Sequence, residues 1–193
     1  EPIAIRSVKR FIADWANENL PPAEKAEVRF DEKVAIIGAG PSGLTAARDL
    51  ALLGYRTTVF EAKSEAGGML RFGIPEYRLP KVALQQDIDR VLALGVELKL
   101  NRAAGKDFTV DSLLADGYRA VYLGVGLQSG RPLPIPGNDA KGVFTAVDLL
   151  RGATLEEPID MGKRVVVIGG GDVAFDAGRA ALRLGAEDVT LVC

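Results

Sequence analysis

The chain of 193 residues has a formal net charge of −2, is 48% hydrophobic and 26% charged, and contains no histidine and a single cysteine, Cys193. A charge this close to zero gives no electrostatic basis for binding nucleic acid or an anionic membrane surface. One cysteine excludes a disulfide, a redox-active cysteine pair or a cysteine-ligated metal cluster within these residues, so any redox chemistry must reside in a bound cofactor.

The beginning of the chain shows no targeting or membrane signal. Residues 1–6 have neither the basic start nor the apolar core of a signal peptide, and no apolar run in the chain approaches the roughly 18 residues of a membrane span. We therefore expect a cytoplasmic protein. Residues 3–16 then predict an amphipathic helix, whose apolar stripe we expect to pack against a core or a neighbouring domain. That stripe comprises Ile5, Val8, Phe11, Ile12 and Trp15.

The next feature is a glycine-rich turn between a strand and a helix. The apolar run 34–37 leads into Gly38-x-Gly40-x-x-Gly43, a predicted helix follows, and a second apolar run ends on Glu61. Gly38 permits the tight turn, Gly40 lets a pyrophosphate approach the backbone, and Gly43 lets helix and strand pack closely. The helix N-terminus would face the phosphates, and Glu61 would accept hydrogen bonds from ribose hydroxyls. The unit predicts a dinucleotide site rather than an unliganded glycine-rich turn.

Between residues 62 and 162 the pattern alternates less regularly. Residues 62–80 contain glycines and prolines without a helical period but with several apolar side chains, which predicts an ordered loop, either packed on the sheet edge or forming a wall of the cofactor pocket. The following segments predict a helix at 81–94, a strand at 96–100, a short helix at 112–115 capped by Asp111, a buried strand at 120–126, an irregular crossing segment at 130–137, and a helix at 144–151 capped by Thr145.

The strand–turn–helix pattern then starts again. Strand 163–168 precedes Gly169-Gly170-Gly171-Asp172-Val173-Ala174, and a helix and a strand follow up to Cys193, where an acidic or basic residue would select between NAD and NADP. This pattern predicts a second dinucleotide site; a strand–helix–strand unit without ligand is the alternative. One such unit cannot cover its own sheet edges, so we interpret the sequence as part of a longer chain.

At this point the motifs resemble a known family, the small (beta) subunit of NADPH-dependent glutamate synthase. The same pattern is found in the reductase portion of dihydropyrimidine dehydrogenase and in bacterial NADPH–ferredoxin oxidoreductases. The resemblance covers essentially the whole chain, and residues 67–81 are its most family-specific part. The segments that carry it are residues 33–44, 59–62, 67–81, 122–126 and 167–176, with residues 1–14 similar to the helix that leads out of that family's iron–sulfur domain.

The resemblance implies an α/β, Rossmann-like FAD/NAD(P)-binding fold, with a parallel central sheet, flanking helices and two dinucleotide domains, the second truncated. It implies that residues 1–30 are a helix and linker from an upstream iron–sulfur-type domain. Residues 31–160 would form an incomplete FAD-binding domain, and residues 161–193 would begin the NAD(P)H-binding domain. The iron–sulfur clusters would lie in absent or partner segments, because the cysteines that ligate them do not occur here.

The family's binding residues transfer to matching positions of this chain. The FAD pyrophosphate would be wrapped by the first glycine turn, the adenosine ribose would be held by Glu61, and the NADPH pyrophosphate would contact the second turn. Arg78 would line the FAD site and offset the pyrophosphate charge, although a surface salt bridge is an equally simple role for it. The implied cofactor-binding residues are Gly38, Ala39, Gly40, Pro41, Ser42, Gly43, Glu61, Gly68, Met69, Arg78, Ala104, Gly126, Gly171, Asp172 and Val173.

The implied function is a relay in which electrons pass from NADPH or NADH through FAD to iron–sulfur clusters and a partner subunit. The flavin carries this chemistry, so no side chain is assigned a catalytic role and no metal ligand is expected. Two other hypotheses stay open. One is a flavin disulfide reductase whose cysteine pair lies beyond Cys193; the other is a non-catalytic nucleotide-binding or electron-transfer scaffold.

Overall fold

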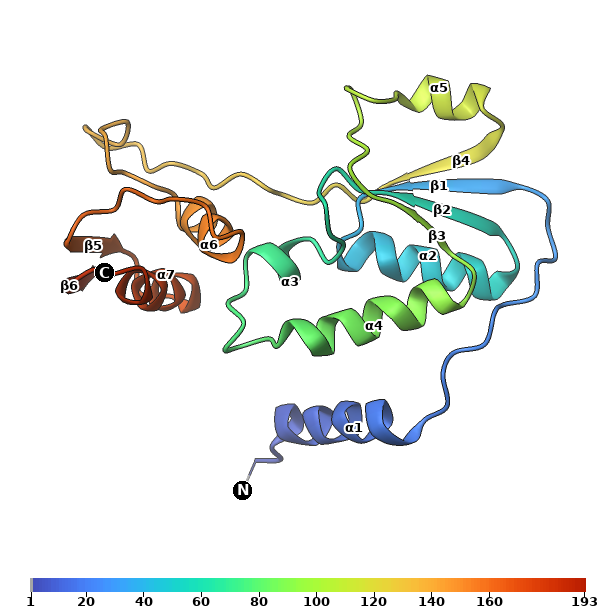
Figure 1. The fold of residues 1–193 in the computed structure, drawn as a ribbon, viewed down its shortest axis with the longest axis horizontal. Helices are drawn as coiled ribbons and strands as arrows, with labels where there is room; N and C mark the ends of the chain where they lie inside the picture. The colour runs from blue at the N-terminus through green and yellow to red at the C-terminus, as the bar shows by residue number, and fades with distance from the viewer. Residues whose placement is uncertain (1) are drawn as a thin grey trace.

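The computed structural model describes residues 2–193 and contains a four-stranded and a two-stranded parallel sheet, joined by a long extended segment (Figure 1). The elements in chain order are α1 (Ile5–Asn19), β1 (Lys33–Ile37), α2 (Pro41–Leu53), β2 (Arg56–Phe60), α3 (Met69–Phe72), α4 (Lys81–Ala93), β3 (Glu97–Lys99), α5 (Val110–Ala115), β4 (Tyr118–Leu123), α6 (Ala146–Thr154), β5 (Arg164–Ile168), α7 (Asp172–Arg183) and β6 (Asp188–Val192). The α/β fold with parallel sheets confirms the predicted class.

The larger sheet has the strand order β3-β2-β1-β4, and all of its pairs are parallel. β1 lies in the interior, with Ile37 opposite Phe60 on one side and opposite Leu123 on the other. Because the strands are parallel, their carboxyl ends meet at one edge of the sheet, which is where ligands bind in open α/β sheets. This topology brings the first glycine turn, Glu61 and the segment after β4 together.

Two hydrophobic clusters cover the two faces of this sheet. On one face α2 and α4 pack against β1 and β2, in a cluster that includes the fully buried Ile36 and Val59. On the other face Phe60, Phe108 and Tyr118 pack together around Leu113 of α5. Figure 1 shows α2 and α4 below the sheet and α5 above it. Because both faces of the sheet are covered, side chains on either side of β1 are buried, which explains why this strand is apolar at every position from Val34 to Ile37.

Three local details differ from the sequence predictions. The cap of α5 is Thr109, whose hydroxyl accepts from the Ser112 N–H at 3.1 Å in a capping box, and not Asp111, which lies inside the first turn. The loop after Glu61 includes the one-turn helix α3, and β4, an edge strand, is exposed over most of its length and not buried as predicted. The Thr145 cap of α6 agrees with the prediction, since its hydroxyl accepts from the Asp148 N–H at 3.2 Å.

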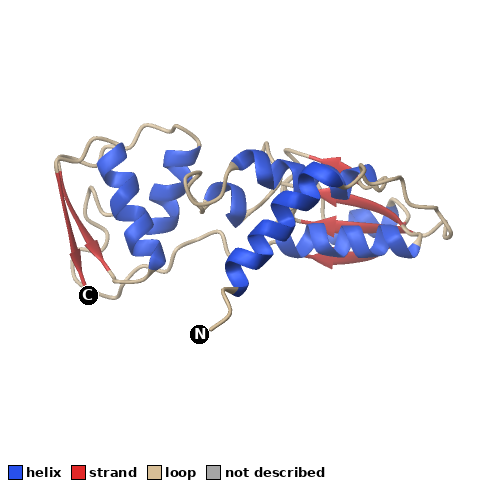
Figure 2. Ribbon diagram, turned by 90° about the horizontal axis from the view of Figure 1, so that it is seen from below, coloured by secondary structure: helices blue, strands red, loops and turns tan. Residues whose placement is uncertain are grey.

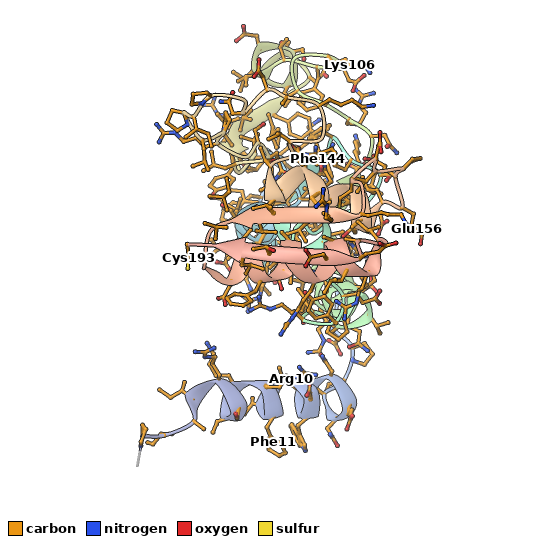
Figure 3. All side chains as sticks on the ribbon, turned by 90° about the vertical axis from the view of Figure 1, so that its left-hand side faces the viewer. Arg10, Phe11, Lys106, Phe144, Glu156 and Cys193 are labelled. Atoms are coloured by element: carbon orange, nitrogen blue, oxygen red, sulfur yellow. The ribbon has the colours of Figure 1, made fainter. Side chains whose placement is uncertain are left out.

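The second sheet repeats the geometry of the first on a smaller scale. β5 and β6 pair over five positions, from Arg164 opposite Asp188 to Ile168 opposite Val192, just as β1 and β2 pair over five. Figure 2 shows α6 and α7 together on one side of this sheet. Figure 3, which looks onto the other side, shows no helix between the viewer and the two strands. In the described part of the chain one face of the second sheet is therefore uncovered.

The N-terminal helix lies apart from both sheets. None of the residues of α1 is buried, and its apolar stripe is exposed, with Phe11 at 69% and Trp15 at 51% of their full accessibility. Figure 3 shows Phe11 on the side of α1 that faces away from the sheets. The expected packing of this stripe is thus not found against residues 2–193. Among the same residues, no helix is both long and apolar enough to cross a membrane.

Candidate dinucleotide-binding site

A cleft of about 330 Å³ opens at the carboxyl edge of the four-stranded sheet. Two backbone hydrogen bonds close its floor: the Gly38 N–H donates to the Phe60 carbonyl and the Gly124 N–H donates to the Ile37 carbonyl, both at 2.8 Å. The cleft is lined by Ile37, Gly38, Gly40, Pro41, Ser42, Phe60, Glu61, Ala62, Lys63, Gly68, Met69, Phe72, Arg102, Ala103, Ala104, Gly124, Val125, Gly126 and Gln128.

The three glycines of the first turn have three different surroundings. Gly38 has φ +104°, and a Cβ there would lie 2.4 Å from the Gly124 carbonyl oxygen. A Cβ on Gly43 would lie 1.9 Å from the Gly38 carbonyl oxygen, inside the contact between α2 and β1. Gly40 lines the cleft, and a Cβ there would meet no atom closer than the Gly68 Cα at 3.8 Å. Gly38 and Gly43 are therefore required by the fold, whereas Gly40 keeps space free for a ligand.

The N-terminus of α2 opens onto this space. Gly40 is the N-cap, Pro41 occupies the first helical turn, and no side chain caps the free N–H groups. Uncapped N–H groups and the positive end of the helix dipole together favour an anion such as a pyrophosphate. The Ser42 hydroxyl is 2.8 Å from the Tyr122 hydroxyl on β4, which orients it at the rim. The lining residues thus present backbone donors where the sequence predicted phosphates.

Glu61 is 8% exposed and its carboxylate is held by two backbone donors. The Ala39 N–H donates to Oε2 at 2.8 Å, and the Lys63 N–H donates to Oε1 at 2.9 Å. A carboxylate has about four acceptor positions, so two remain for further donors such as a pair of hydroxyls. The side chain is fixed by the same glycine turn that would hold the phosphates, and it lines the cleft.

The loop after Glu61 forms one wall of the cleft. The Gly67 N–H donates to the Ala39 carbonyl at 2.8 Å, and Gly67 and Gly68 both have positive φ, +124° and +55°. A Cβ on Gly68 would lie 2.8 Å from the Gly40 Cα, so the two glycine segments touch backbone to backbone. Met69 follows directly as a lining residue. Of the two roles considered for this loop, the wall of the cleft is the one that its position favours.

The second glycine turn, residues 169–174, has a backbone geometry similar to that of the first, but Cys193 stands at the position equivalent to Glu61, directly after the second strand of the unit. The Gly169 N–H donates to the Val192 carbonyl at 2.7 Å, as Gly38 does to Phe60, and Gly171 caps α7 without a side-chain hydrogen bond. A Cβ on Gly171 would meet nothing within 4 Å. Asp172 and Val173 begin the helix and are both exposed, Asp172 at 88% of its side-chain accessibility. The backbone of the second turn is therefore open to a ligand in the same sense as the first.

Comparison with known proteins places this geometry in a family. Residues 32–193 match the family described as pyridine nucleotide-disulphide oxidoreductase. The chain belongs to this family. The match covers both glycine turns and both sheets, and the Rossmann-like FAD/NAD(P)-binding fold predicted from the sequence is confirmed.

Relatives of this oxidoreductase chain align over almost its whole length. It is 43% identical to the NADP(+)-dependent formate dehydrogenase subunit beta of Moorella thermoacetica over 100% of the chain and 31% of that protein. It is 40% identical to the glutamate synthase [NADPH] small chain of Escherichia coli over 97% of the chain and 42% of that protein. The chain thus spans less than half the length of these relatives, and the expected resemblance to glutamate synthase small chains is confirmed.

A solved structure supports the same assignment. FprA from Mycobacterium tuberculosis, in complex with NADPH, superposes on the oxidoreductase chain with a TM-score of 0.71 and 26% identity. The superposition covers 84% of this chain and 43% of FprA.

The structure brings most of the predicted site residues of this oxidoreductase together. The residues that line the cleft are Gly38, Gly40, Pro41, Ser42, Glu61, Gly68, Met69, Ala104 and Gly126. Ala39 lies behind the wall, fully buried, and contributes its N–H to Glu61, while Gly43 lies in the contact of helix and strand. Gly171, Asp172 and Val173 lie at the second turn, apart from this cleft.

Arg78, predicted to line the FAD site, does not line the first cleft. Its Nη1 atom donates to Asp176 Oδ2 of α7 at 2.8 Å, and its Nη2 atom is 4.0 Å from Asp172 Oδ2. The salt-bridge alternative for Arg78 therefore describes its position better than the FAD-lining role does. Sequence spacing could not show this, because the partner lies 98 residues further along the chain.

Sequence reasoning did not identify two basic residues of the cleft, Lys63 and Arg102. Lys63 follows Glu61 by two positions, and the Arg102 N–H donates to the Glu61 carbonyl at 2.8 Å. Each lies three residues after the last residue of a strand, and that placement was the available signal. They add positive charge where the uncapped helix N-terminus already favours an anion.

Glu61 offers a direct test of the ribose role. We expect Glu61→Gln to weaken FAD binding about tenfold, because a neutral amide accepts weaker hydrogen bonds from hydroxyls than a carboxylate does. Both carboxylate oxygens accept a backbone N–H, so glutamine, with one acceptor oxygen, keeps one of the two bonds, whereas alanine would lose both, at a cost of about 1–3 kcal/mol for each unpaired donor. Flavin titration measures the effect. Glu32→Gln, an exposed site just before β1, is the control for loss of one charge, and equal affinities of both variants would contradict the assignment.

Proposed function

We propose that this chain is the nucleotide-binding part of a flavin oxidoreductase that takes electrons from NADPH or NADH and passes them through FAD to iron–sulfur clusters of a partner subunit or domain. In this proposal residues 31–160 bind FAD and residues 161–193 begin the NAD(P)H-binding part. Residues 1–30 connect to an upstream domain, and a cytoplasmic location stays part of the proposal. The single observation that carries it is the cleft at the first turn, with Gly40 open and Glu61 fixed behind it.

The residues present fit an FAD molecule. The free N–H groups of α2 and the open side of Gly40 provide a seat for a pyrophosphate, with Lys63 and Arg102 nearby as counter-charges. Glu61 provides acceptors for ribose hydroxyls, and Ala103 and Ala104 form an uncharged wall next to it. When bound, FAD would supply the ring that accepts a hydride from a nicotinamide and releases electrons singly. The described side chains serve to bind and orient it, and none is required as an acid or base.

The names of the relatives support the remaining parts of the proposal. The Moorella thermoacetica relative is named a subunit and NADP(+)-dependent, and the E. coli relative is named the small chain of an NADPH enzyme. Both names fit a chain that works with a partner and a pyridine nucleotide. The second glycine turn, open at Gly171, is the place we propose for that nucleotide.

The test is anaerobic stopped-flow of the full-length protein that contains this chain, mixed with NADPH and, separately, with NADH. We expect the flavin absorbance near 450 nm to bleach with at least one of the two nucleotides, at a rate consistent with the roughly 1–1,000 s⁻¹ of typical enzyme turnover. A protein that binds FAD but is bleached by neither nucleotide would reject the oxidoreductase function and favour a scaffold. A protein that binds no FAD would reject the cofactor assignment itself.

A further inference from the structure

A small polar cluster joins the loop of the first nucleotide unit to the helix of the second. The Tyr77 hydroxyl donates to Asp176 Oδ1 at 2.9 Å, and Arg78 Nη1 donates to Asp176 Oδ2 at 2.8 Å. Asp176 is 6% exposed, so its carboxylate is largely removed from water. A buried carboxylate needs hydrogen bonds and a charged partner, and here both come from the other unit. We call Tyr77, Arg78 and Asp176 the latch.

Two arginines of α7 extend the latch around the Tyr77 ring. The Arg183 guanidinium lies 4.2 Å from the ring centroid, and the Arg179 guanidinium lies 6.0 Å from it, both within range of a cation–π interaction. Burial raises the pKa of Tyr77, and the hydrogen bond to Asp176 raises the pKa of Arg78. Both groups therefore keep their protons near neutral pH and stay donors to the carboxylate.

The segment that carries the latch also builds the first cleft. Gly68, Met69 and Phe72 line the cleft, and only a short turn separates them from Tyr77. That turn is fixed by the Arg78 and Leu79 N–H groups, which donate to the Pro75 carbonyl at 2.9 and 3.1 Å. One continuous segment thus contacts the first glycine turn at its beginning and the helix of the second glycine turn at its end.

We propose that Tyr77, Arg78 and Asp176 are positioning residues that hold the second nucleotide unit against the first, so that a nicotinamide bound to one meets a flavin bound to the other. This inference rests on the proposed function. The physical reason is the sensitivity of such a reaction to distance: a misplacement of about 1 Å can cost on the order of 100-fold in rate. Between the two units the chain runs through an irregular stretch, residues 124–145, that contains no strand or helix, and α3 also contacts α6 beside the second sheet. A buried charge with a unique set of partners fixes one arrangement of them.

The kinetic test uses the full-length protein with Asp176→Asn and Arg78→Lys. We expect flavin reduction at saturating NAD(P)H to slow at least tenfold in each variant, with FAD content and nucleotide dissociation constant unchanged within twofold. The double variant should be no slower than the slower single variant, because either change already breaks the latch. The matched control is Glu187→Gln, which removes the exposed ion pair with Lys163 on the same unit and should leave the rate unchanged.

Other outcomes would overturn the inference. Unchanged reduction rates in both variants would show that the latch does not position the units. A loss of FAD content or a weaker nucleotide affinity that accounts for the slower rate would show that these residues bind ligand instead.

Hydrogen exchange followed by mass spectrometry tests the latch without any redox reaction. We expect faster exchange in residues 75–80 and in α7 of Asp176→Asn, because the two segments protect each other, and no change in α2 or β1. Equal protection in the variant and the wild type would overturn the latch. If the wild-type flavin is bleached by neither nucleotide, the proposed function fails, and the exchange result alone decides whether the latch holds the units together.

Discussion

Replacing Gly40 by valine is expected to weaken FAD binding at least 100-fold, a loss of about 2.7 kcal/mol or more, while the protein stays folded. The backbone at Gly40 has φ −79° and ψ −178°, which any residue adopts, and the nearest atom to a Cβ there is 3.8 Å away. A Cβ therefore fits the fold, and the valine side chain would take up space beside the cleft, at the N-terminus of α2, that we assign to the pyrophosphate. Flavin fluorescence titration measures the affinity.

The second turn provides a matched control for this prediction. Gly171 occupies the equivalent N-cap position of α7, with φ −88°, and a Cβ there meets nothing within 4 Å. Gly171→Val should leave FAD affinity unchanged and weaken NAD(P)H binding. Circular dichroism should show both variants folded. Wild-type FAD affinity in Gly40→Val would place the flavin elsewhere, and loss of FAD in Gly171→Val would refute the separate assignment of the two turns.

Replacing Gly43 by alanine is expected to destabilise the protein by about 1–3 kcal/mol or more, although it adds only one methyl group. The Cβ would lie 1.9 Å from the Gly38 carbonyl oxygen and 3.2 Å from Ile36 Cγ2. The first of these is a backbone atom, so no rotamer change can relieve the clash, and α2 must move away from β1. Urea unfolding followed by circular dichroism measures the shift in midpoint.

Thr45→Ala is the control for this change, because Thr45 is exposed two residues further along α2 and makes no side-chain hydrogen bond to the rest of the described chain. It should leave the midpoint unchanged or raise it slightly, since alanine favours helix. A Gly43→Ala variant as stable as Thr45→Ala would mean that the contact of helix and strand relaxes freely. In that case the clash expected for a Cβ would not show that Gly43 is required for packing whereas Gly40 leaves room for a ligand.

Much of the first site followed from local sequence. A strand, a glycine turn and a helix are determined by residues within about thirty positions, so Gly38, Gly40, Gly43 and Glu61 could be found by spacing alone. Gly68, Met69, Ala104 and Gly126 came instead from the resemblance to a family, and all four line the cleft.

The predictions were weaker wherever the partner of a residue is distant in sequence. The Asp176 partner of Arg78 lies 98 positions away, and the stripe of α1 has no partner among residues 2–193. The cap of α5 is a further case, because threonine and aspartate are both favourable N-cap residues. Thr109 is the cap here because the Ser112 hydroxyl accepts from the Thr109 N–H at 3.0 Å and so completes a capping box.

The sequence by itself determined the two βαβ units, the parallel pairing, and the residues that leave room for phosphate, because turn geometry and helix termini depend on neighbouring residues and on the absence of a Cβ. The tertiary structure alone decided which backbone donors hold the Glu61 carboxylate and which basic residues line the cleft. It also decided which helix the end of the loop after Gly68 contacts. These features depend on how parallel strands bring remote segments to one edge of a sheet. The latch belongs to this second group, since a buried Asp176 acquires its meaning only from the Tyr77 and Arg78 side chains packed against it.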